Sequence, residues 1–338
     1  MTGLTIGRVA DRVSAEDWHR VVAASHRADY VALPADPVEE LLPLLGGSAA
    51  GERVELWLGR VDAEPVAAVD LRFPTHDNPD GATLELFVHP DRRRLGHGRD
   101  VLRHVLGRVS NAGRRKLFAD VAETPATPAP GSRLAHRAGA RPVLAEVRRM
   151  LDLTELSAER LAGLRERAAA AASGYTVVAW VDRAAGSDLE DLAKLKSRMS
   201  TDAPLGEMAW EPEAWDAARY RAGEDLAIAQ GRRRLATAVR CEATGRLVGY
   251  TDIGINPRQP DVGYQWDTIV RAEHRGHRLG LLLKTANLQL LGREVPAARS
   301  LNTWNAASNT YMIEINDLLG FRPVDRWQTW ELELPAGQ

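Results

Sequence analysis

The chain has 338 residues, more than the ~100–200 residues of one ordinary domain, and 44% of them are hydrophobic, enough for each half to build its own core. Lys and Arg total 44 against 46 Asp and Glu, so the net charge of −2 provides no overall field to attract nucleic acid or an acidic membrane. The chain has one cysteine, Cys241, which excludes an intrachain disulfide and a thiolate metal cage, and we predict no bound metal. The sequence shows no signal-peptide pattern and no apolar run of ~18 residues, which predicts a cytoplasmic protein.

The first half of the chain alternates strand and helix patterns in an order typical of a mixed α/β sheet. These elements are a strand at 4–9, a helix at Ala15–Arg27, strands at 54–61 and 66–73, a strand ending at Val88 and an amphipathic helix around 101–109. A strand at 117–121, a helix and another strand complete the first half. The third of the sheet strands runs directly into a glycine-bearing loop. We expect this loop to carry the chemistry.

The second half repeats the same order at an offset of 182 residues, which predicts a duplicated domain. The aligned pairs are Val88 with Val270, Arg93 with Arg275 and Gly98 with Gly280. Residues 156–174 are rich in Ala, Arg and Glu and predict a solvent-facing linker helix. We therefore predict a first domain at 1–155, the linker at 156–174 and a second domain at 175–338.

The segment 88–98, VHPDRRRLGHG, places a strand end, a basic cluster and two glycines before a helix. Free N–H groups and the dipole of a helix N-terminus favour an anion, and glycine lets the backbone approach phosphate oxygens closely. A nucleotide-hydrolase P-loop is excluded because the chain has no Gly-Lys dipeptide, and a Rossmann fingerprint lacks its third glycine. Pyrophosphate is the ligand that this pattern favours.

The residues Val88, Pro90, Arg93, Gly96 and Gly98 form the pattern V-x-P-x-x-R-x-x-G-x-G, which resembles the acyl-CoA-binding signature of the GCN5-related N-acetyltransferases. The resemblance covers nearly the whole chain as two tandem copies, similar in arrangement to mycothiol synthases. It implies two tandem domains, each a mixed β-sheet flanked by helices, whose fourth and fifth strands splay apart around the pantetheine arm of acetyl-CoA. The cofactor-binding residues implied in the first domain are Val88, Arg93, Arg94, Leu95, Gly96, His97, Gly98 and Arg99.

In the second domain the same pattern is altered, since Ala272 replaces the proline and Arg278 the first glycine. We expect this loop to bind phosphate with a changed geometry. The cofactor-binding residues implied there are Val270, Arg275, Gly276, His277, Arg278, Leu279, Gly280, Asn305 and Asn309. For Asn305, which directly precedes a helical stretch, helix capping is an equally good role.

The predicted catalytic residues are two carboxylates and one amide. Asp267 and Glu85 each lie three residues before a strand end that borders the thioester, where a carboxylate could take the proton of an amine. The alternative for each is a solvated or ion-paired strand residue. The resemblance places Asn316 at the position of the tyrosine that often protonates the CoA thiolate, and Ala135 at the matching position of the first domain. Asn316 supplies no proton readily, so we expect water to do so.

These residues imply an N-acetyltransferase that uses acetyl-CoA and acts on a small-molecule amine by direct attack in a ternary complex. The second half holds seven of nine Trp and five of six Tyr, from which we expect an aromatic acceptor pocket, and the chemistry, in that half. Trp210 and Trp215 either line this pocket or pack against the sheet. Two alternatives stay open: a degenerate protein that binds acyl-CoA without turnover, and an enzyme for longer acyl groups or protein amines. The oligomeric state is also open.

Overall fold

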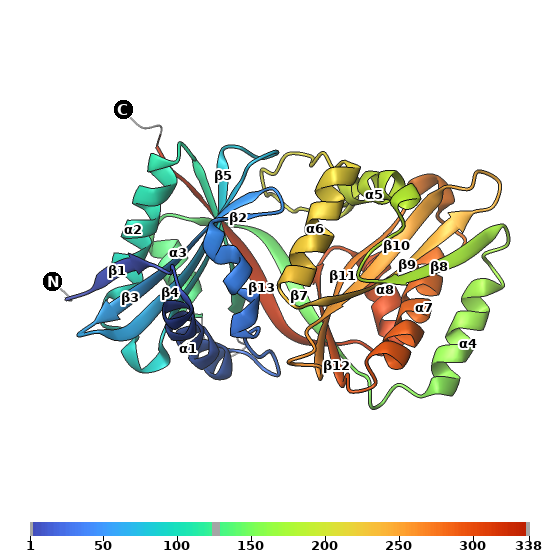
Figure 1. Ribbon diagram of the computed structural model, residues 1–338, viewed down its shortest axis with the longest axis horizontal. Coiled ribbons are helices and arrows are strands. Elements are labelled where there is room, and N and C mark those ends of the chain that lie inside the picture. Colours follow the sequence, from blue (N-terminus) through green and yellow to red (C-terminus); the bar gives the residue numbers. More distant parts are fainter. Residues whose placement is uncertain (1–2, 124–128, 336–338) are drawn as a thin grey trace. The chain divides into compact units, whose positions relative to one another are not determined.

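A computed structural model describes residues 3–123 and 129–335, which form two compact units (Figure 1). Unit 1 comprises Met1–Glu146, Leu205–Glu211 and Asp325–Gln338, and unit 2 comprises Val147–Pro204 and Pro212–Val324. Each unit is a mixed β-sheet with helices packed on it, which confirms the predicted fold class. None of the helices in the described ranges is long and apolar enough to cross a membrane.

The sheet of unit 1 follows the order β1-β3-β4-β5-β6-β13-β7, with the short β2 paired to β3. Its strands are β1 (Thr5–Arg8), β2 (Ser48–Ala49), β3 (Glu52–Val61), β4 (Glu64–Pro74), β5 (Gly81–Val88), β6 (Lys116–Glu123), the first half of β7 (Arg141–Asp152) and most of β13 (Arg322–Glu333). Strands β1, β3, β4 and β5 are antiparallel neighbours, whereas β5 and β6 are parallel. The three strands predicted at 4–9, 54–61 and 66–73 are confirmed as β1, β3 and β4.

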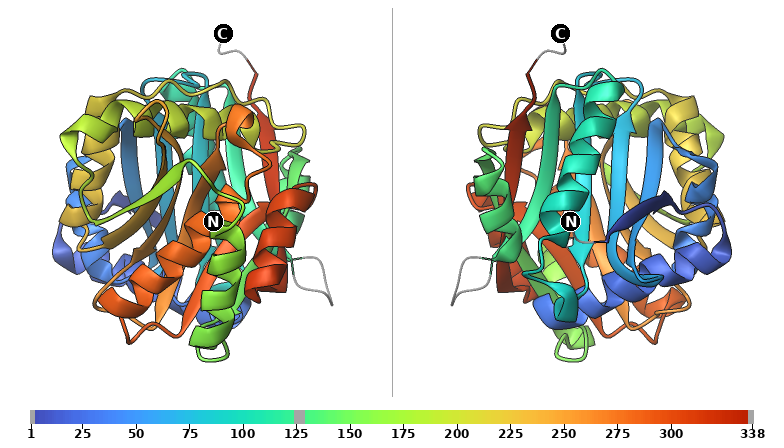
Figure 2. Two further views of the ribbon diagram at one scale, coloured as in Figure 1. Left: turned by 90° about the vertical axis from the view of Figure 1, so that its right-hand side faces the viewer. Right: turned by 90° about the vertical axis from the view of Figure 1, so that its left-hand side faces the viewer.

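The helices of unit 1 pack on this sheet and position the loop that follows β5. They are α1 (Arg12–Asp29), α2 (His97–Asn111) and α3 (Pro130–Arg137), with short 3₁₀ turns η1 (Val38–Glu40), η2 (Leu42–Gly46) and η3 (Pro90–Arg92). Val101, Val105 and Val109 of α2 are buried at helical spacing in one core with apolar residues of β4 and β5. The right-hand view of Figure 2 shows α2 lying across the strands.

The sheet of unit 2 follows the order β7-β12-β11-β10-β9-β8. Its elements are α4 (Ala158–Ala169), β8 (Tyr175–Val181), η4 (Gly186–Asp188), α5 (Leu189–Asp202), α6 (Ala217–Ala229), β9 (Arg233–Cys241), β10 (Leu247–Ile255), β11 (Val262–Val270), η5 (Ala272–His274), α7 (Leu279–Glu294), β12 (Ser300–Ala306) and α8 (Thr310–Leu319). Strands β8 to β11 are antiparallel and β11 pairs with β12 in parallel. The sequence patterns did not predict α6.

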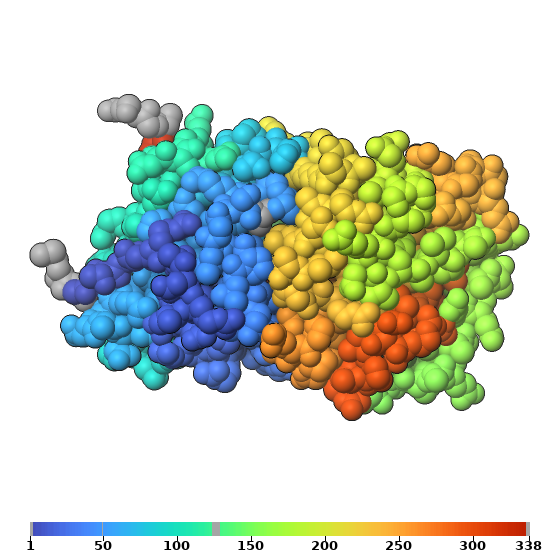
Figure 3. Space-filling view, in the orientation of Figure 1, coloured from blue at the N-terminus to red at the C-terminus, as the bar shows by residue number. Residues whose placement is uncertain are grey.

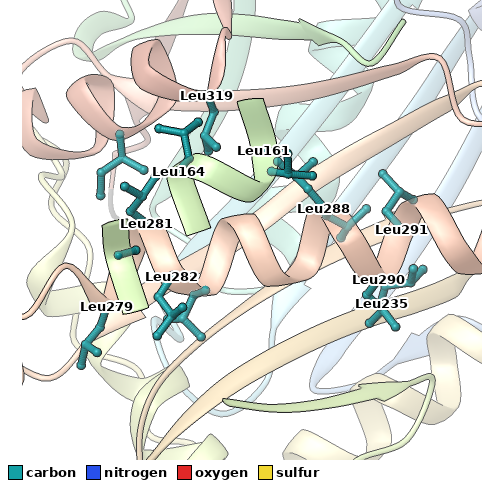
Figure 4. Packing of buried hydrophobic residues seen from close by; sticks show 14 of the residues in the cluster. Leu161, Leu164, Leu235, Leu279, Leu281, Leu282, Leu288, Leu290, Leu291 and Leu319 are labelled. Carbon is teal, nitrogen blue, oxygen red and sulfur yellow. The ribbon is translucent and has the colours of Figure 1, made fainter. Parts of the chain in front are cut away.

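Two separate cores cover the two faces of the unit 2 sheet. Alternate residues of β9 belong to different cores: Leu235 and Val239 lie with the leucines of α7, whereas Ala238 lies with α5 and α6. Figure 4 shows the first of these, the α7 core, in which leucines from α4, α7 and α8 meet Leu235. On the other face, α5 and α6 form much of the outer surface of this unit that Figure 3 displays.

The helix predicted as a solvent-facing linker packs against unit 2 in the structure. Helix α4 spans much of 156–174, but Leu161, Leu164 and Ala168 are buried in the α7 core. Spacings of three and four residues place these small and apolar side chains on one face of the helix, so α4 packs onto unit 2 and exposes its charged residues on the other side. The prediction of a solvent-facing linker was wrong for this face.

The two units do not end at the predicted domain boundaries, because two strands continue from one unit into the other. Residues 147–152 of β7 belong to unit 2, although the strand begins in unit 1, and residues 325–333 of β13 belong to unit 1. Eight residues of β13, from Arg326 to Glu333, pair antiparallel with β6 from Glu123 to Lys116. The last strand of the chain therefore lies beside β6 in the sheet of the first unit.

Candidate active site

The parallel pairing between β5 and β6 ends after three residue pairs. Gly81, Ala82 and Thr83 face residues 116–118, and from there β5 stays paired with β4 whereas β6 stays paired with β13. In unit 2, Val262 to Tyr264 pair with residues 300–302 in the same way, and the register then ends. Both sheets thus have the splayed strand pair that the family resemblance implies.

Strand β11 carries a further irregularity that β5 lacks. Thr251 of β10 faces Thr268, but Ile253, two residues on, faces Gln265, so β11 has one residue too many in this stretch. Such a β-bulge redirects side chains and is common beside active sites. The extra residue lies at Trp266 and Asp267, next to the end of the β11/β12 pairing.

The loop after β5 leads into α2 with its backbone in left-handed conformations. Arg94 has a φ of +66° and Gly96, the N-cap of α2, a φ of +93°. No side chain caps this helix, so its first N–H groups are free to bind an anion. A Cβ at Gly98 would lie 3.5 Å from Val88 Cγ2, an ordinary contact, so the glycine is not required for packing within the loop.

The equivalent loop of unit 2 keeps the same backbone with the glycine at the other position. Gly276, which aligns with Arg94, has a φ of +88°, and Arg278, which aligns with Gly96, caps α7 with a φ of +53°. Both left-handed positions are thus kept although the glycine has moved, because an arginine at such a position costs only about 1–2 kcal/mol; the altered phosphate-binding geometry stays a prediction. Helix α7 likewise begins without a side-chain cap.

The arginine of the sequence motif has a structural role in both loops. Nη1 and Nη2 of Arg93 donate to the Asp29 carboxylate over 2.7 and 2.6 Å, and its Nε donates to the carbonyl of Val88 over 3.0 Å. Arg275 repeats this arrangement, donating to Asp202 over 2.7 Å and to the carbonyl of Val270 over 3.2 Å. Each arginine ties the loop to the end of α1 or α5, so its guanidinium already has a carboxylate partner, and its contact with phosphate stays a prediction.

The other predicted cofactor-binding residues divide into exposed and buried groups. Exposed around the helix starts are Arg94, Leu95, Arg99, His277 and Arg278, whereas His97, Leu279 and Gly280 are buried. A Cβ at Gly280 would lie 3.0 Å from Ile315 Cδ1, so this glycine lets α8 approach α7. The exposed cations and the free N–H groups remain the candidates for phosphate contact.

The two predicted catalytic carboxylates have opposite electrostatics. Glu85 on β5 keeps contact with solvent, but desolvation by the surrounding protein, followed by the nearby Asp70 carboxylate, raises the pKa of its carboxyl to about 7. Asp267 is largely covered, yet the Lys196 ammonium at 2.6 Å and the Tyr250 hydroxyl outweigh its desolvation and hold the pKa of its carboxyl below the usual range. Glu85 can exchange a proton near neutral pH, whereas Asp267 stays ionised.

Three aromatic residues of β11 and β12 lie near the end of the β11/β12 pairing. Tyr264 stacks on Trp266 with ring centroids 5.5 Å apart and lies nearly parallel to Trp304 of β12 at 6.3 Å. Trp266 is 47% exposed, so one ring of this stack is open to solvent. We call Tyr264, Trp266 and Trp304 the aromatic stack.

Three of the seven tryptophans in the second half of the sequence lie in unit 1, whereas the five tyrosines of that half lie in unit 2. Trp210, Trp327 and Trp330 belong to unit 1, where Trp210 meets Phe118 edge-on with centroids 5.3 Å apart. Trp215 is in unit 2, where the Arg219 guanidinium lies 4.2 Å from its ring centroid. The chain distributes tryptophans to both units because β13 and residues 205–211 return to the first.

Asn316 is fully buried and lies within a chain of polar side chains. Lys284 Nζ donates to Asn316 Oδ1 over 2.9 Å, and Asn316 Nδ2 donates to Asn305 Oδ1 over 2.7 Å. Asn305 lies on β12 beyond the last residue paired with β11 and does not cap α8; that role belongs to Asn309, whose Oδ1 accepts from Met312 N over 3.2 Å. Sequence reasoning missed Lys284, although one lysine among the leucines of 279–291 is a visible signal.

Comparisons with known proteins agree with this geometry. Residues 18–131 match the model of the Acetyltransferase (GNAT) family. The structure of a tandem GNAT protein from the clavulanic acid biosynthesis pathway is similar with a TM-score of 0.82 and 28% sequence identity, covering 99% of each chain. A comparison with curated proteins gave no significant match.

Two more distant structures show the fold alone. A GCN5-related N-acetyltransferase from Sphaerobacter thermophilus has a TM-score of 0.66 and 17% identity over 98% of this chain and 96% of that one. N-myristoyltransferase of Saccharomyces cerevisiae, with bound myristoyl-CoA, has a TM-score of 0.62 and 13% identity over 98% of this chain and 78% of that one. The fold of this chain therefore recurs in proteins of low sequence identity.

Proposed function

Because this chain is a tandem protein of the GCN5-related N-acetyltransferase (GNAT) family, we propose that it transfers an acetyl group from acetyl-CoA to the amine of a small molecule by direct attack within a ternary complex. An acyl-CoA donor fits both loops, since each helix start offers free N–H groups and exposed basic side chains to a pyrophosphate. The splayed strands leave backbone groups of β5 and β11 unpaired beside the loop, where a pantetheine amide can bind.

One observation carries the assignment of the chemistry to unit 2. The two faces of its sheet present complementary groups at the β11/β12 pairing end: Asp267 with the aromatic stack on one side, and Asn305 with Asn316 on the other. An amine needs a carboxylate and a cation-binding surface, whereas the thioester sulfur needs a hydrogen-bond donor. In unit 1 the position matching Asn316 is Ala135, which offers no such donor.

Asp267 would act on the acceptor by exchanging its ion-pair partner. An incoming ammonium group takes the place of Lys196 beside the carboxylate, gives up one proton there, and then attacks the thioester carbon as the neutral amine. Removing a positioned base of this kind typically costs 10²–10⁴ in rate. The aromatic stack would hold the body of the acceptor while Asp267 holds the amine.

A thiol-release assay tests this function. The chain is incubated with acetyl-CoA and a panel of polyamines, amino sugars and aromatic amines, and free CoA thiol is followed with a thiol reagent. We expect release with at least one amine class, abolished in Asp267→Asn but retained in Asp261→Asn, an exposed carboxylate just before β11. Release that needs no amine, or none with any member of the panel, would contradict the proposal.

A second candidate places the same reaction in unit 1. Glu85 favours it, because a carboxyl with a pKa of about 7 is matched to a general base at neutral pH. Under this alternative, Glu85→Gln abolishes thiol release and Asp267→Asn retains it. Binding of acyl-CoA without turnover is the remaining candidate; the ion pair that occupies Asp267 favours it, and acetyl-CoA would then bind without any amine-dependent thiol release.

A further inference from the structure

We propose that Lys284 is a positioning residue that stabilises the departing CoA thiolate in unit 2 through its hydrogen bond to Asn316. This inference rests on the proposed function, because it takes the sulfur to lie beside Asn316. It assigns a role to a buried lysine that lies outside the loop motif and outside the acceptor side of the sheet.

The geometry aligns three side chains from three elements. Lys284 of α7 is 2% exposed and donates to Asn316 of α8, which is itself 0% exposed and donates to Asn305 of β12. A cation that binds the amide oxygen of Asn316 polarises this amide and strengthens its Nδ2–H as a donor. The donor is directed at β12 beyond Asn302, the point at which β12 has left β11.

Lys284 lacks the partner that usually compensates a buried ammonium. No carboxylate in the described residues forms an ion pair with it, and its Nζ lies 5.5 Å from the Phe321 ring centroid. Burial alone lowers the pKa of the amine to about 7, and no charged group on α4, α8 or strands β8 to β12 contributes to this shift. Such a residue reduces stability compared with an apolar one, which points to a functional reason for its presence.

The duplicated unit provides an internal control. At the repeat offset of 182, Lys284 aligns with Leu102 of α2, which is 8% exposed and packs in the core of unit 1. Asn316 matches Ala135, because each lies four residues before a glycine, Gly320 or Gly139. The two positions are thus both polar in unit 2 and both apolar in unit 1, as expected if lysine and asparagine act together.

In the reaction, the amine nitrogen attacks the thioester carbon, a C–N bond forms, and the C–S bond breaks with its electron pair leaving on sulfur. The proton that the amine loses balances the proton that the CoA thiol finally gains. Lys284 donates no net proton; its charge, relayed by the Asn316 amide, lowers the energy of the thiolate while it forms. Interactions made only with this developing charge affect kcat more than KM.

The test uses the small number of lysines in the chain. Lys116, Lys194, Lys196 and Lys284 are the four, so ¹³C labelling at lysine Cε gives few signals, and Lys284→Gln identifies the one of interest. We expect its titration midpoint near pH 7 in the free protein. CoA should raise this midpoint, because thiolate and ammonium stabilise each other reciprocally, whereas a CoA analogue lacking sulfur should leave it unchanged.

Steady-state kinetics supply the second measurement. Lys284→Gln keeps a donor without charge and should lower kcat about 10- to 100-fold with little change in KM for acetyl-CoA. The matched control is Asn287→Leu, which removes another buried polar group of α7 that bonds only to the Leu235 carbonyl and should leave kcat unchanged. A Lys284 midpoint that CoA at saturation does not move, or an unchanged kcat in Lys284→Gln, overturns the proposal. Failure of CoA to bind, or of any amine to react, overturns the proposed function instead.

Discussion

Replacing Lys284 by the leucine of unit 1 should stabilise the protein at neutral pH and do so less as the pH rises. The amine has a pKa of about 7 in the folded chain, against 10.5 for a lysine exposed to water. Between these values the unfolded chain binds more protons than the folded one, so the stability of the natural protein increases with pH. Its full penalty, about 5 kcal/mol for a shift of about 3.5 units, applies below pH 7 and vanishes above pH 10.5.

Lys284→Leu removes this dependence, so the difference in the free energy of unfolding between the two proteins should shrink by about 2 kcal/mol from pH 7 to pH 9. Urea unfolding of both proteins at several pH values, followed by circular dichroism, measures it. Asn287→Leu serves as the control, with a difference that does not vary with pH. Two parallel stability curves for the natural protein and Lys284→Leu would refute the reasoning, because they would mean that the amine titrates alike in the folded and unfolded chains.

Three further predictions concern the binding loop and the reaction. Gly98→Val should weaken CoA binding to unit 1. The protein should still fold, because a Cβ at this position meets Val88 and Leu134 only at ordinary contact distance. Calorimetry should show the loss of one of two CoA sites, and an unchanged stoichiometry would mean that the loop is not part of a CoA site. If unit 1 is catalytic, kcat/KM should fall as the pH drops through about 7, where Glu85 takes up a proton, and Glu85→Gln should lack this limb; a limb that survives the substitution excludes Glu85 as the base. Tyr311→Phe should leave kcat unchanged, because Tyr311 is 54% exposed on α8 and its hydroxyl lies over the start of α7, 3.7 Å from the place of a Cβ at Gly280. A large loss of kcat would instead mean that this phenol protonates the CoA thiolate.

The repeat and the loop motif could be predicted from sequence because they are local. The loop motif spans only eleven residues, 88–98. These residues contain the strand end, two positions of positive φ and the helix start, so short-range spacing is enough to predict the loop. The partner of Arg93 could not be predicted in this way, since Asp29 is distant in sequence and becomes adjacent only when α1 packs on the sheet. The sequence therefore predicted the motif arginine only as a cofactor-binding residue and not as a link between the loop and α1.

The acceptor side shows the same limit. Asp267 was placed correctly on the strand beside the loop, but its ion pair with Lys196 depends on how α5 crosses the sheet. Lys284 was overlooked because the leucine spacing of 279–291 predicts an amphipathic helix with a polar side. In the structure α7 is buried on nearly all sides, so its one lysine has no solvent to reach.

Strand β13 follows unit 2 in sequence but completes the sheet of unit 1, and this order affects folding during synthesis. Most of unit 1 is synthesised before unit 2, but the sheet of unit 1 contains residues 326–333, which are synthesised after unit 2. Until then the β6 edge that β13 will cover has unpaired backbone groups, a surface prone to pairing with other strands. Residues 1–155 expressed alone would keep this edge open, and loss of the last strand would damage the unit farthest from it in sequence. One cut in the chain therefore cannot separate the two units without opening this edge.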